Sequence, residues 1–181
     1  MSEHDAETSG AGDLIFIEPS SGFEIRAISQ SERAAVEALI RSGAIEAMAA
    51  SMLAALMDIP DGQVFGGFQR GEMVAVYALR RDGMANDLAL IVVAPEQRKR
   101  GVGRSLLQDA LRRSGKRPLA AQTPEDVLRF FKACGFKLVG RRVQPSGDVW
   151  FRVGWHAPGS HFKGGTTNAL TSRGLDSSSE T

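Results

Sequence analysis

Along the middle of the chain, segments with the hydrophobic period of a β-strand alternate with segments that have the hydrophobic period of an α-helix. A period of two, as in Phe23–Ile28, indicates a strand with one buried face, and apolar residues three and four positions apart indicate an amphipathic helix. These patterns predict one strand, two helices, three strands, then a helix, a strand, a helix and two final strands. The predicted elements cover residues 23–28, 29–43, 45–56, 64–70, 73–80, 88–93, 102–114, 119–122, 124–134, 136–142 and 149–155.

Turn and cap signals connect these elements. Ser29 and Glu32 have the spacing of a capping box at the start of the first helix, and Gly43 is expected to end that helix. Asp82-Gly83 is a strong signal for a β-hairpin, so the three central strands are expected to be antiparallel neighbours. Hairpins followed by alternating strands and helices predict an α+β fold with mixed αβα layers.

The two ends of the chain differ in composition from the middle. Residues 1–12 are polar, acidic and small, and residues 157–181 are rich in Gly, Ser and Thr. Such segments bury too little apolar surface to offset the entropy lost on ordering, so we expect two disordered tails. Residues 13–156 then form a single domain, which agrees with a total length of 181 residues.

Composition and charge argue against several classes of function. The formal net charge is +1, so no overall field attracts nucleic acid, and no apolar stretch is long enough to span a bilayer. Cys134 is the only cysteine and the three histidines lie toward the chain ends, so neither an internal disulfide nor a resident metal is expected. The N-terminus lacks the pattern of a secretory signal, and we expect a cytoplasmic protein without nucleic-acid or membrane partners.

The most informative stretch is the basic turn Arg98–Gly103, which follows a hydrophobic strand and precedes an amphipathic helix. The first N–H groups of a helix have no intrahelical partners, and together with the helix dipole they favour an anion. Gly101 and Gly103 leave room for a phosphate at the backbone, and basic side chains surround them. The stretch matches neither a Walker loop nor a dinucleotide fingerprint. It predicts a site for a pyrophosphate.

This stretch resembles the coenzyme A signature of the GCN5-related N-acetyltransferase (GNAT) superfamily. Val93-Ala94-Pro95-Glu96 matches the end of the family's strand, and Arg98-x-x-Gly101-x-Gly103 matches its phosphate turn. The order of elements over residues 23–155 is also similar to that of the family, and the segment from Phe131 to Phe136 resembles its later Tyr-x-x-x-Gly-Phe motif. The resemblance implies a largely antiparallel central sheet of about six to seven strands, about four flanking helices, and a splayed strand pair that binds coenzyme A.

The resemblance also implies a cosubstrate and the residues that bind it. Acetyl-CoA would lie with its pantetheine along the exposed edge of Leu90–Val93, like an added strand, and with its pyrophosphate on the turn. It implies no metal. The residues implied in cofactor binding are Ile91, Val92, Val93, Arg98, Lys99, Arg100, Gly101, Val102, Gly103, Arg104, Ser105, Thr123 and Phe131.

Acetyl transfer to an amine needs a base, and the resemblance places one at the start of the strand that leads into the turn. Asp87 occupies that place and is the first candidate for the base, and its position just after the hairpin favours an exposed turn residue as the alternative interpretation. Glu72 and Glu24 are alternatives, and Glu96 is expected to serve the loop or the helix N-terminus.

The acid that would protonate the leaving thiolate is harder to assign. The family's usual tyrosine and asparagine are replaced here by Phe131 and Pro124. Tyr77, the only tyrosine, is a second catalytic candidate, but a sheet residue with a satisfied hydroxyl is the favoured interpretation. The thiolate could leave without a dedicated acid.

These observations predict an acetyl-CoA-dependent N-acetyltransferase that acts on a primary amine by direct attack in a ternary complex. Thr123 and the pair Phe130-Phe131 resemble family members that acetylate amino acids or other small metabolites, which favours a small-molecule acceptor. A protein amine as acceptor, and a coenzyme A-binding regulatory domain without catalysis, are the alternatives. Whether the chain forms a homodimer is left open.

Overall fold

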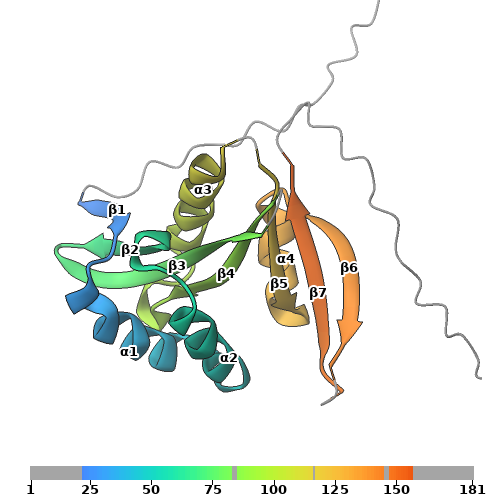
Figure 1. Cartoon of the computed structure of the whole chain (residues 1–181), viewed down its shortest axis with the longest axis horizontal. Coiled ribbons are helices and arrows are strands. Elements are labelled where there is room, and N and C mark those ends of the chain that lie inside the picture. The colour runs from blue at the N-terminus through green and yellow to red at the C-terminus, as the bar shows by residue number, and fades with distance from the viewer. Residues whose placement is uncertain (1–21, 83–84, 116, 145–146, 157–181) are drawn as a thin grey trace, which may run out of the picture.

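The computed structural model describes residues 22–82, 85–115, 117–144 and 147–156 (Figure 1). The tails expected at 1–12 and 157–181 lie outside these residues, as does Gly83 of the expected hairpin turn. The strands are β1 (Phe23–Ala27), β2 (Val64–Gln69), β3 (Glu72–Asp82), β4 (Ala85–Val93), β5 (Leu119–Pro124), β6 (Lys137–Val143) and β7 (Val149–Trp155). The helices are α1 (Arg33–Gly43), α2 (Glu46–Met57), α3 (Val102–Ser114) and α4 (Glu125–Ala133), with 3₁₀ turns η1 (Gln30–Glu32), η2 (Asp61–Gln63) and η3 (Pro95–Gln97).

The strands form one seven-stranded sheet in the order β1-β2-β3-β4-β5-β7-β6. Every neighbouring pair is antiparallel except β4 and β5, which are parallel. The predicted α+β fold and the antiparallel arrangement of the three central strands are therefore confirmed. β3 and β4 run further toward their hairpin than predicted, because Arg80, Arg81 and Asp82 pair with residues 85–87.

Helices cover the two faces of the sheet (Figure 1). α1 and α2 pack mainly against β3 and β4, α3 packs against the same two strands, and α4 packs against β5, β7 and β6. Two separate apolar cores result, one on each face. The core under α3 and α4 includes Phe65, Tyr77, Leu88, Leu106, Leu107, Leu119, Ala121, Leu128, Phe131 and Val153. The core under α1 and α2 includes Ile28, Val36, Ile40, Leu56, Val64, Val76, Leu90 and Val92.

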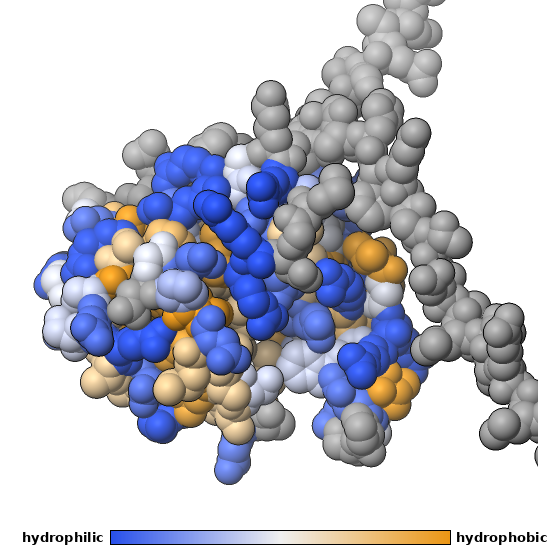
Figure 2. All heavy atoms as spheres, viewed as in Figure 1, coloured by the Kyte–Doolittle hydropathy of each residue, from blue (hydrophilic) through white to orange (hydrophobic). Residues whose placement is uncertain are grey.

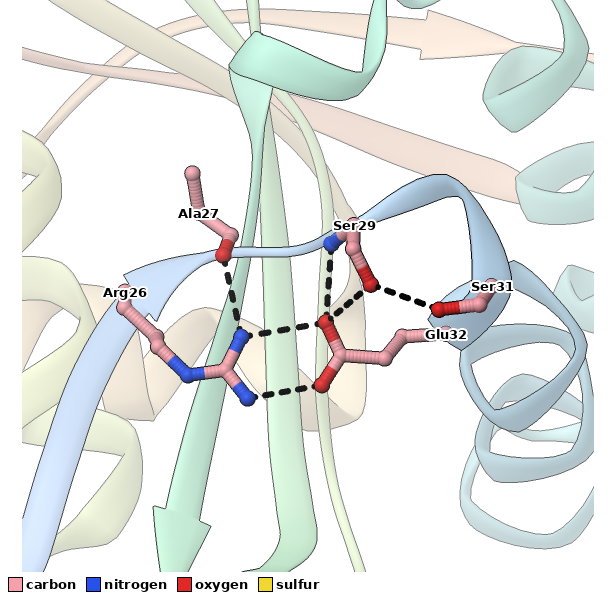
Figure 3. Close-up of polar contacts among 5 residues, drawn as sticks. All are labelled: Arg26, Ala27, Ser29, Ser31 and Glu32. Carbon is pink, nitrogen blue, oxygen red and sulfur yellow. Dashed lines mark hydrogen bonds and ion pairs between the residues drawn. The ribbon is translucent and has the colours of Figure 1, made fainter.

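A polar network fixes the entry into α1 (Figure 3). The Glu32 carboxylate accepts hydrogen bonds from the backbone N–H and the hydroxyl of Ser29, both at 2.8 Å, in the predicted capping box. The Arg26 guanidinium donates to the same carboxylate at 2.7 and 3.0 Å and lies 3.9 Å from the centroid of the Phe68 ring. These contacts join the end of β1 to the helix that follows it.

We predict that Glu32→Gln destabilises the fold at neutral pH and has little effect near pH 2. The hydrogen bonds from Arg26 and Ser29 lower the pKa of Glu32 from 4.5 to about 2. The ionised carboxylate therefore stabilises the folded state above its unfolded pKa, and this contribution is lost as the pH falls through about 2. Thermal unfolding of both proteins across this pH range measures the effect. A difference in Tm that does not change with pH would contradict it.

Candidate functional site

The sheet opens between β4 and β5. These parallel strands are paired only where Asn86–Leu88 meets Leu119–Ala121, although β4 continues to Val93 and β5 to Pro124. Beyond the last pair, β4 stays paired with β3 and β5 stays paired with β7. The edge of Ala89–Val93 that faces β5 therefore has no strand partner among the described residues. Its backbone N–H and C=O groups can bind an extended ligand.

A β-bulge lies where the two strands separate. Leu88 is opposite Leu79 of β3 and Leu90 is opposite Ala78, so Ala89 is an extra residue on β4. Leu88 belongs to the core under α3, and Leu90 belongs to the core under α1. A bulge bends its strand and re-aims the side chains around it. β4 therefore changes direction at the point where β5 departs.

The basic turn connects the end of β4 to the start of α3. Lys99 and Gly101 have positive φ angles of 60° and 83°, and α3 begins at the next residue, Val102. Glycine suits this position because L side chains rarely adopt such a φ, and no described atom lies within 4 Å of the place where a Cβ on Gly101 would be. This open space adjoins the first N–H groups of α3 and the exposed side chains of Lys99 and Arg100.

Arg98 has a structural contact that the sequence motif did not indicate. Its guanidinium donates to the carbonyl oxygen of Gly43 at the end of α1 and, at 3.3 Å, to that of Val93 at the end of β4. Gly43 permits this close approach, because a Cβ on it would lie 2.7 Å from Cγ1 of Val92. Arg98 therefore ties α1 to the strand that leads into the turn, whereas the side chains of Lys99 and Arg100 are exposed.

Gly103 belongs to the basic turn and also allows close packing against the side chains of Phe130 and Val93. A Cβ on Gly103 would lie 3.2 Å from Cζ of Phe130 and 3.7 Å from Cγ2 of Val93. Phe130 thus joins α4 to the end of β4 and to the first turn of α3. Open space was expected at both motif glycines, but within the described structure only Gly101 has it, because the Phe130 ring lies against Gly103.

Two further residues that the resemblance implied in cofactor binding are buried. Phe131 is 2% exposed and packs edge-on against Phe136 with a ring-centroid distance of 5.3 Å. Thr123 is 1% exposed, and its hydroxyl donates to the carbonyl oxygen of Pro124 at 3.3 Å. Cys134, at the end of α4, is also buried, and this burial raises the pKa of its thiol. None of Phe131, Thr123 and Cys134 presents an exposed proton donor.

Asp87 lies on β4 at the start of the opening. It is opposite Arg80 of β3 and Ala120 of β5, and its Oδ2 accepts a hydrogen bond from the Arg80 guanidinium at 3.0 Å. Its side chain is 13% exposed, and its Oδ1 is buried without a hydrogen-bond partner among the described residues. Since the neighbouring Leu88 points into the core under α3, Asp87 lies on the opposite face, which is the face of α1 and α2.

Tyr77, the second catalytic candidate, is enclosed between the sheet and α3. Its side chain is 0% exposed, and its hydroxyl donates to Asp109 at 2.5 Å. Asp109 is 2% exposed and also accepts hydrogen bonds from Arg112 and, at 2.7 Å, from Arg113. Burial and the Asp109 carboxylate raise the pKa of Tyr77 above its usual range. The hydroxyl therefore holds its proton in a packing role.

The alternative carboxylates lie elsewhere. Glu24 is on β1 at the far edge of the sheet, Glu72 begins β3 at the β2–β3 turn, and Glu96 is exposed in η3. Of these four carboxylates, Asp87 alone is on a strand that borders the opening. Within the described ranges, no group of three or more His, Cys, Asp or Glu could hold a metal ion, and no helix is both long and apolar enough to cross a membrane.

Comparison with a known family agrees with this geometry. Residues 60–138, from just before η2 into β6, match the family described as the acetyltransferase (GNAT) domain. Residues 60–138 of this chain are therefore similar to a GNAT acetyltransferase domain. The resemblance seen in the sequence is thereby confirmed, and the domain makes the chain an N-acetyltransferase of the acyltransferase class. The sequence matches none of the curated proteins.

Several solved structures have the same fold as this chain. Ard1 from Thermoplasma volcanium has a TM-score of 0.62 and 16% identity, over 75% of this chain and 97% of that chain. The ribosomal-protein-S18-alanine N-acetyltransferase from Escherichia coli has a TM-score of 0.59 and 16% identity, over 77% and 99%. A GNAT family acetyltransferase from Elizabethkingia anophelis with acetyl-CoA bound has a TM-score of 0.59 and 14% identity, over 76% and 99%.

We expect Tyr77→Phe in this GNAT domain to lower the free energy of unfolding by about 2 kcal/mol, because a buried charged acceptor loses one donor. Since the hydroxyl is enclosed, kcat should not change. Denaturant unfolding and steady-state kinetics on the same preparation measure both quantities. A fall in kcat by roughly a hundredfold, with acetyl-CoA still bound, would instead assign proton transfer to Tyr77.

Proposed function

We propose that the chain transfers the acetyl group of acetyl-CoA to the primary amine of a small molecule, by direct attack in a ternary complex. The observation that carries the proposal is the separation of β4 from β5 directly before an exposed basic turn at the start of α3. An extended pantetheine fits the free edge of a strand, and a pyrophosphate fits the N-terminus of a helix.

Each part of the cosubstrate has candidate partners in this chain. The backbone of Ile91–Val93 would bind the amide groups of the pantetheine, as a neighbouring strand would. The N–H groups of Val102–Arg104, with the side chains of Lys99, Arg100 and Arg104, would bind the pyrophosphate, whereas the N–H of Ser105 already donates to the carbonyl oxygen of Gly101 at 3.0 Å. The acetyl-CoA bound to the similar structure from Elizabethkingia anophelis supports this choice of ligand.

Asp87 is the proposed base. The amine nitrogen attacks the thioester carbon, a C–N bond forms, the C–S bond breaks, and the proton that the amine loses passes to Asp87 directly or through water. The hydrogen bond from Arg80 holds Oδ2 in place, while Oδ1 has no described partner and can accept the proton. The carboxylate lies on the face of the sheet from which an acceptor can approach without crossing the core under α3.

The leaving thiolate departs without a dedicated acid in this proposal. Phe131 cannot donate a proton, and the hydroxyl of Tyr77 is bound to Asp109. A thiol with an ordinary pKa of about 8.5 is already a fair leaving group at neutral pH. The substitution of Phe for the usual Tyr is therefore compatible with turnover.

Two alternatives are tested by the same assay. The Escherichia coli relative is named for a protein substrate, so an amine at a protein N-terminus is the alternative acceptor. The release of free coenzyme A is measured over a panel of small amines and free N-terminal peptides. Turnover with peptides alone would favour the protein acceptor, and tight acetyl-CoA binding without turnover on any amine would favour a regulatory domain.

We predict that Arg100→Gln lowers kcat/KM for acetyl-CoA about tenfold, because a charge-assisted contact to phosphate is lost. The value for S-acetylpantetheine, which has no pyrophosphate, should not change. Arg70→Gln is the control, since Arg70 is exposed at the β2–β3 turn and is not among the residues proposed to bind the cofactor. Equal losses with both thioesters would remove Arg100 from the pyrophosphate site.

We predict that Asp87→Asn lowers kcat by a factor of roughly 10² to 10⁴, the usual contribution of a general base. The affinity for acetyl-CoA, measured by calorimetry, should stay the same, because Asp87 lies before the edge that binds pantetheine. Glu72→Gln is the matched control. If Glu72→Gln reduced kcat and Asp87→Asn did not, the base would have to be reassigned.

A further inference from the structure

The half-sheet made by β5, β7 and β6 has an open face. α4 packs on one side of it, while α1 and α2 lie mainly over β3 and β4 (Figure 1). Leu119 and Ala121 point into the core under α4, so the alternate residues of β5 lie on the other, open face. Residues paired across the strands form three rows on this face. In the order β5, β7, β6, the rows are Ala120, Gly154 and Lys137; Gln122, Arg152 and Gly140; and Pro124, Trp150 and Arg142.

This open face is continuous with the proposed site of acetyl transfer. Asp87 of β4 is opposite Ala120 of β5, and Ala120 is opposite Gly154 of β7. The carboxylate of Asp87 and the open face therefore lie on the same side of the sheet. An acceptor whose amine lies near Asp87 extends over β5 and β7.

The open face carries positive charge. β5, β6 and β7 contain four basic residues and no Asp or Glu, and Lys137, Arg142 and Arg152 of these lie on the open face and are exposed. Within the described part of the chain, none of the three forms an ion pair. The nearest acids along these strands are Asp148 in the β6–β7 turn and Asp87. Figure 2 shows mostly hydrophilic residues over this half of the molecule.

Gly140 leaves space beside Arg152. The two residues are opposite each other on β6 and β7, and nothing lies within 4 Å of the place where a Cβ on Gly140 would be. Gly140 has no positive φ, so its backbone does not require glycine. Arg142 is the diagonal neighbour of Arg152, with Cα atoms about 7–8 Å apart, within reach for two long side chains. Two guanidinium groups can converge over this space.

We infer that the open face selects an acceptor with an anionic group, a carboxylate or a phosphate, which Arg142 and Arg152 bind while the amine lies near Asp87. Guanidinium groups match both anions with paired hydrogen bonds. The Cα atoms of Asp87 and Arg152 are two strands and two residues apart, roughly 12 Å, which an amino-acid-sized molecule and the two side chains can fill. The inference rests on the proposed function and adds the class of acceptor.

A compact anion fits this face better than a polyanion. Three basic residues share a small area, and the net charge of the whole chain is only +1. Binding of an extended nucleic acid would need a longer basic track. Because Gly140 has no side chain, the surface of the sheet beside Arg152 is open to a small anionic group.

Steady-state kinetics with matched acceptors tests the inference. Each pair compares an amine that carries an anionic group with one that lacks it: amino acids against their carboxamides, and phosphoethanolamine against ethanolamine. The unsubstituted protein should prefer the anionic member at least tenfold in kcat/KM. Arg152→Gln and Arg142→Gln should each lower this preference about tenfold without changing the KM for acetyl-CoA. Arg152→Glu should reverse it.

Arg141→Gln is the matched control, because it removes the same charge from the adjacent position of β6. Arg141 is opposite Phe151, so it lies on the α4 side of the sheet. It should leave the preference unchanged. Gly140→Leu fills the space beside Arg152 and should raise the KM for the anionic acceptor, while the melting temperature and acetyl-CoA affinity are retained.

The outcomes separate this inference from the proposed function. If no amine is acetylated, the proposed function fails. If neutral and anionic amines are acetylated equally, or if Arg141→Gln and Arg142→Gln have the same effect, the enzyme stands and the anionic acceptor is wrong. If only peptides with acidic N-terminal residues react, the small-molecule acceptor is overturned.

Discussion

The early separation of β4 from β5 is the constraint on which the site depends. The two strands pair over Asn86–Leu88 only, and beyond this point each is held by its other neighbour. α3 packs against the β3–β4 half and α4 against the β5–β7–β6 half, so each half keeps its own core contacts across the gap. Backbone groups on a free edge need a partner, either water or a ligand. The packing of two helices thus maintains an edge that an extended ligand can complete.

The position of the basic turn depends on two sets of contacts within the protein, one at Asp109 and one at Arg98. A buried carboxylate is unfavourable without partners, and Asp109 has three, of which Tyr77 belongs to β3. This contact joins α3 to the strand next to β4. At the other side of the turn, Arg98 joins the end of β4 to the end of α1. These contacts hold the turn in place before an anion binds, which lowers the entropy lost on binding.

The sequence predicted the secondary-structure elements, which depend on local patterns, and missed the contacts between residues that are far apart in the sequence. The hydrophobic periodicity and the capping box of Ser29 and Glu32 predicted the order of elements, because each of these signals depends only on residues that are close together in the sequence. The end of pairing after Leu88 is a matter of register between distant strands, and only the family resemblance pointed to it. Arg98 was expected to bind phosphate, yet its bond to Gly43 crosses 55 positions of sequence. Likewise, nothing in the pattern around Phe130 indicated that its ring lies against Gly103.

The structure divides the proposed reaction between backbone and side chains. The cosubstrate is expected to bind a strand edge and a helix N-terminus, and these backbone features tolerate many side chains. The acceptor would lie over β5, β7 and β6, where outward-facing side chains can change without altering a core, since β6 is exposed along nearly its whole length. Selection of the acceptor can therefore vary independently of acetyl-CoA binding. In this chain, the proposed basic residues Arg142 and Arg152 and the proposed base Asp87 lie on the same face of the sheet, and together they would orient an acceptor that carries both an amine and an anion.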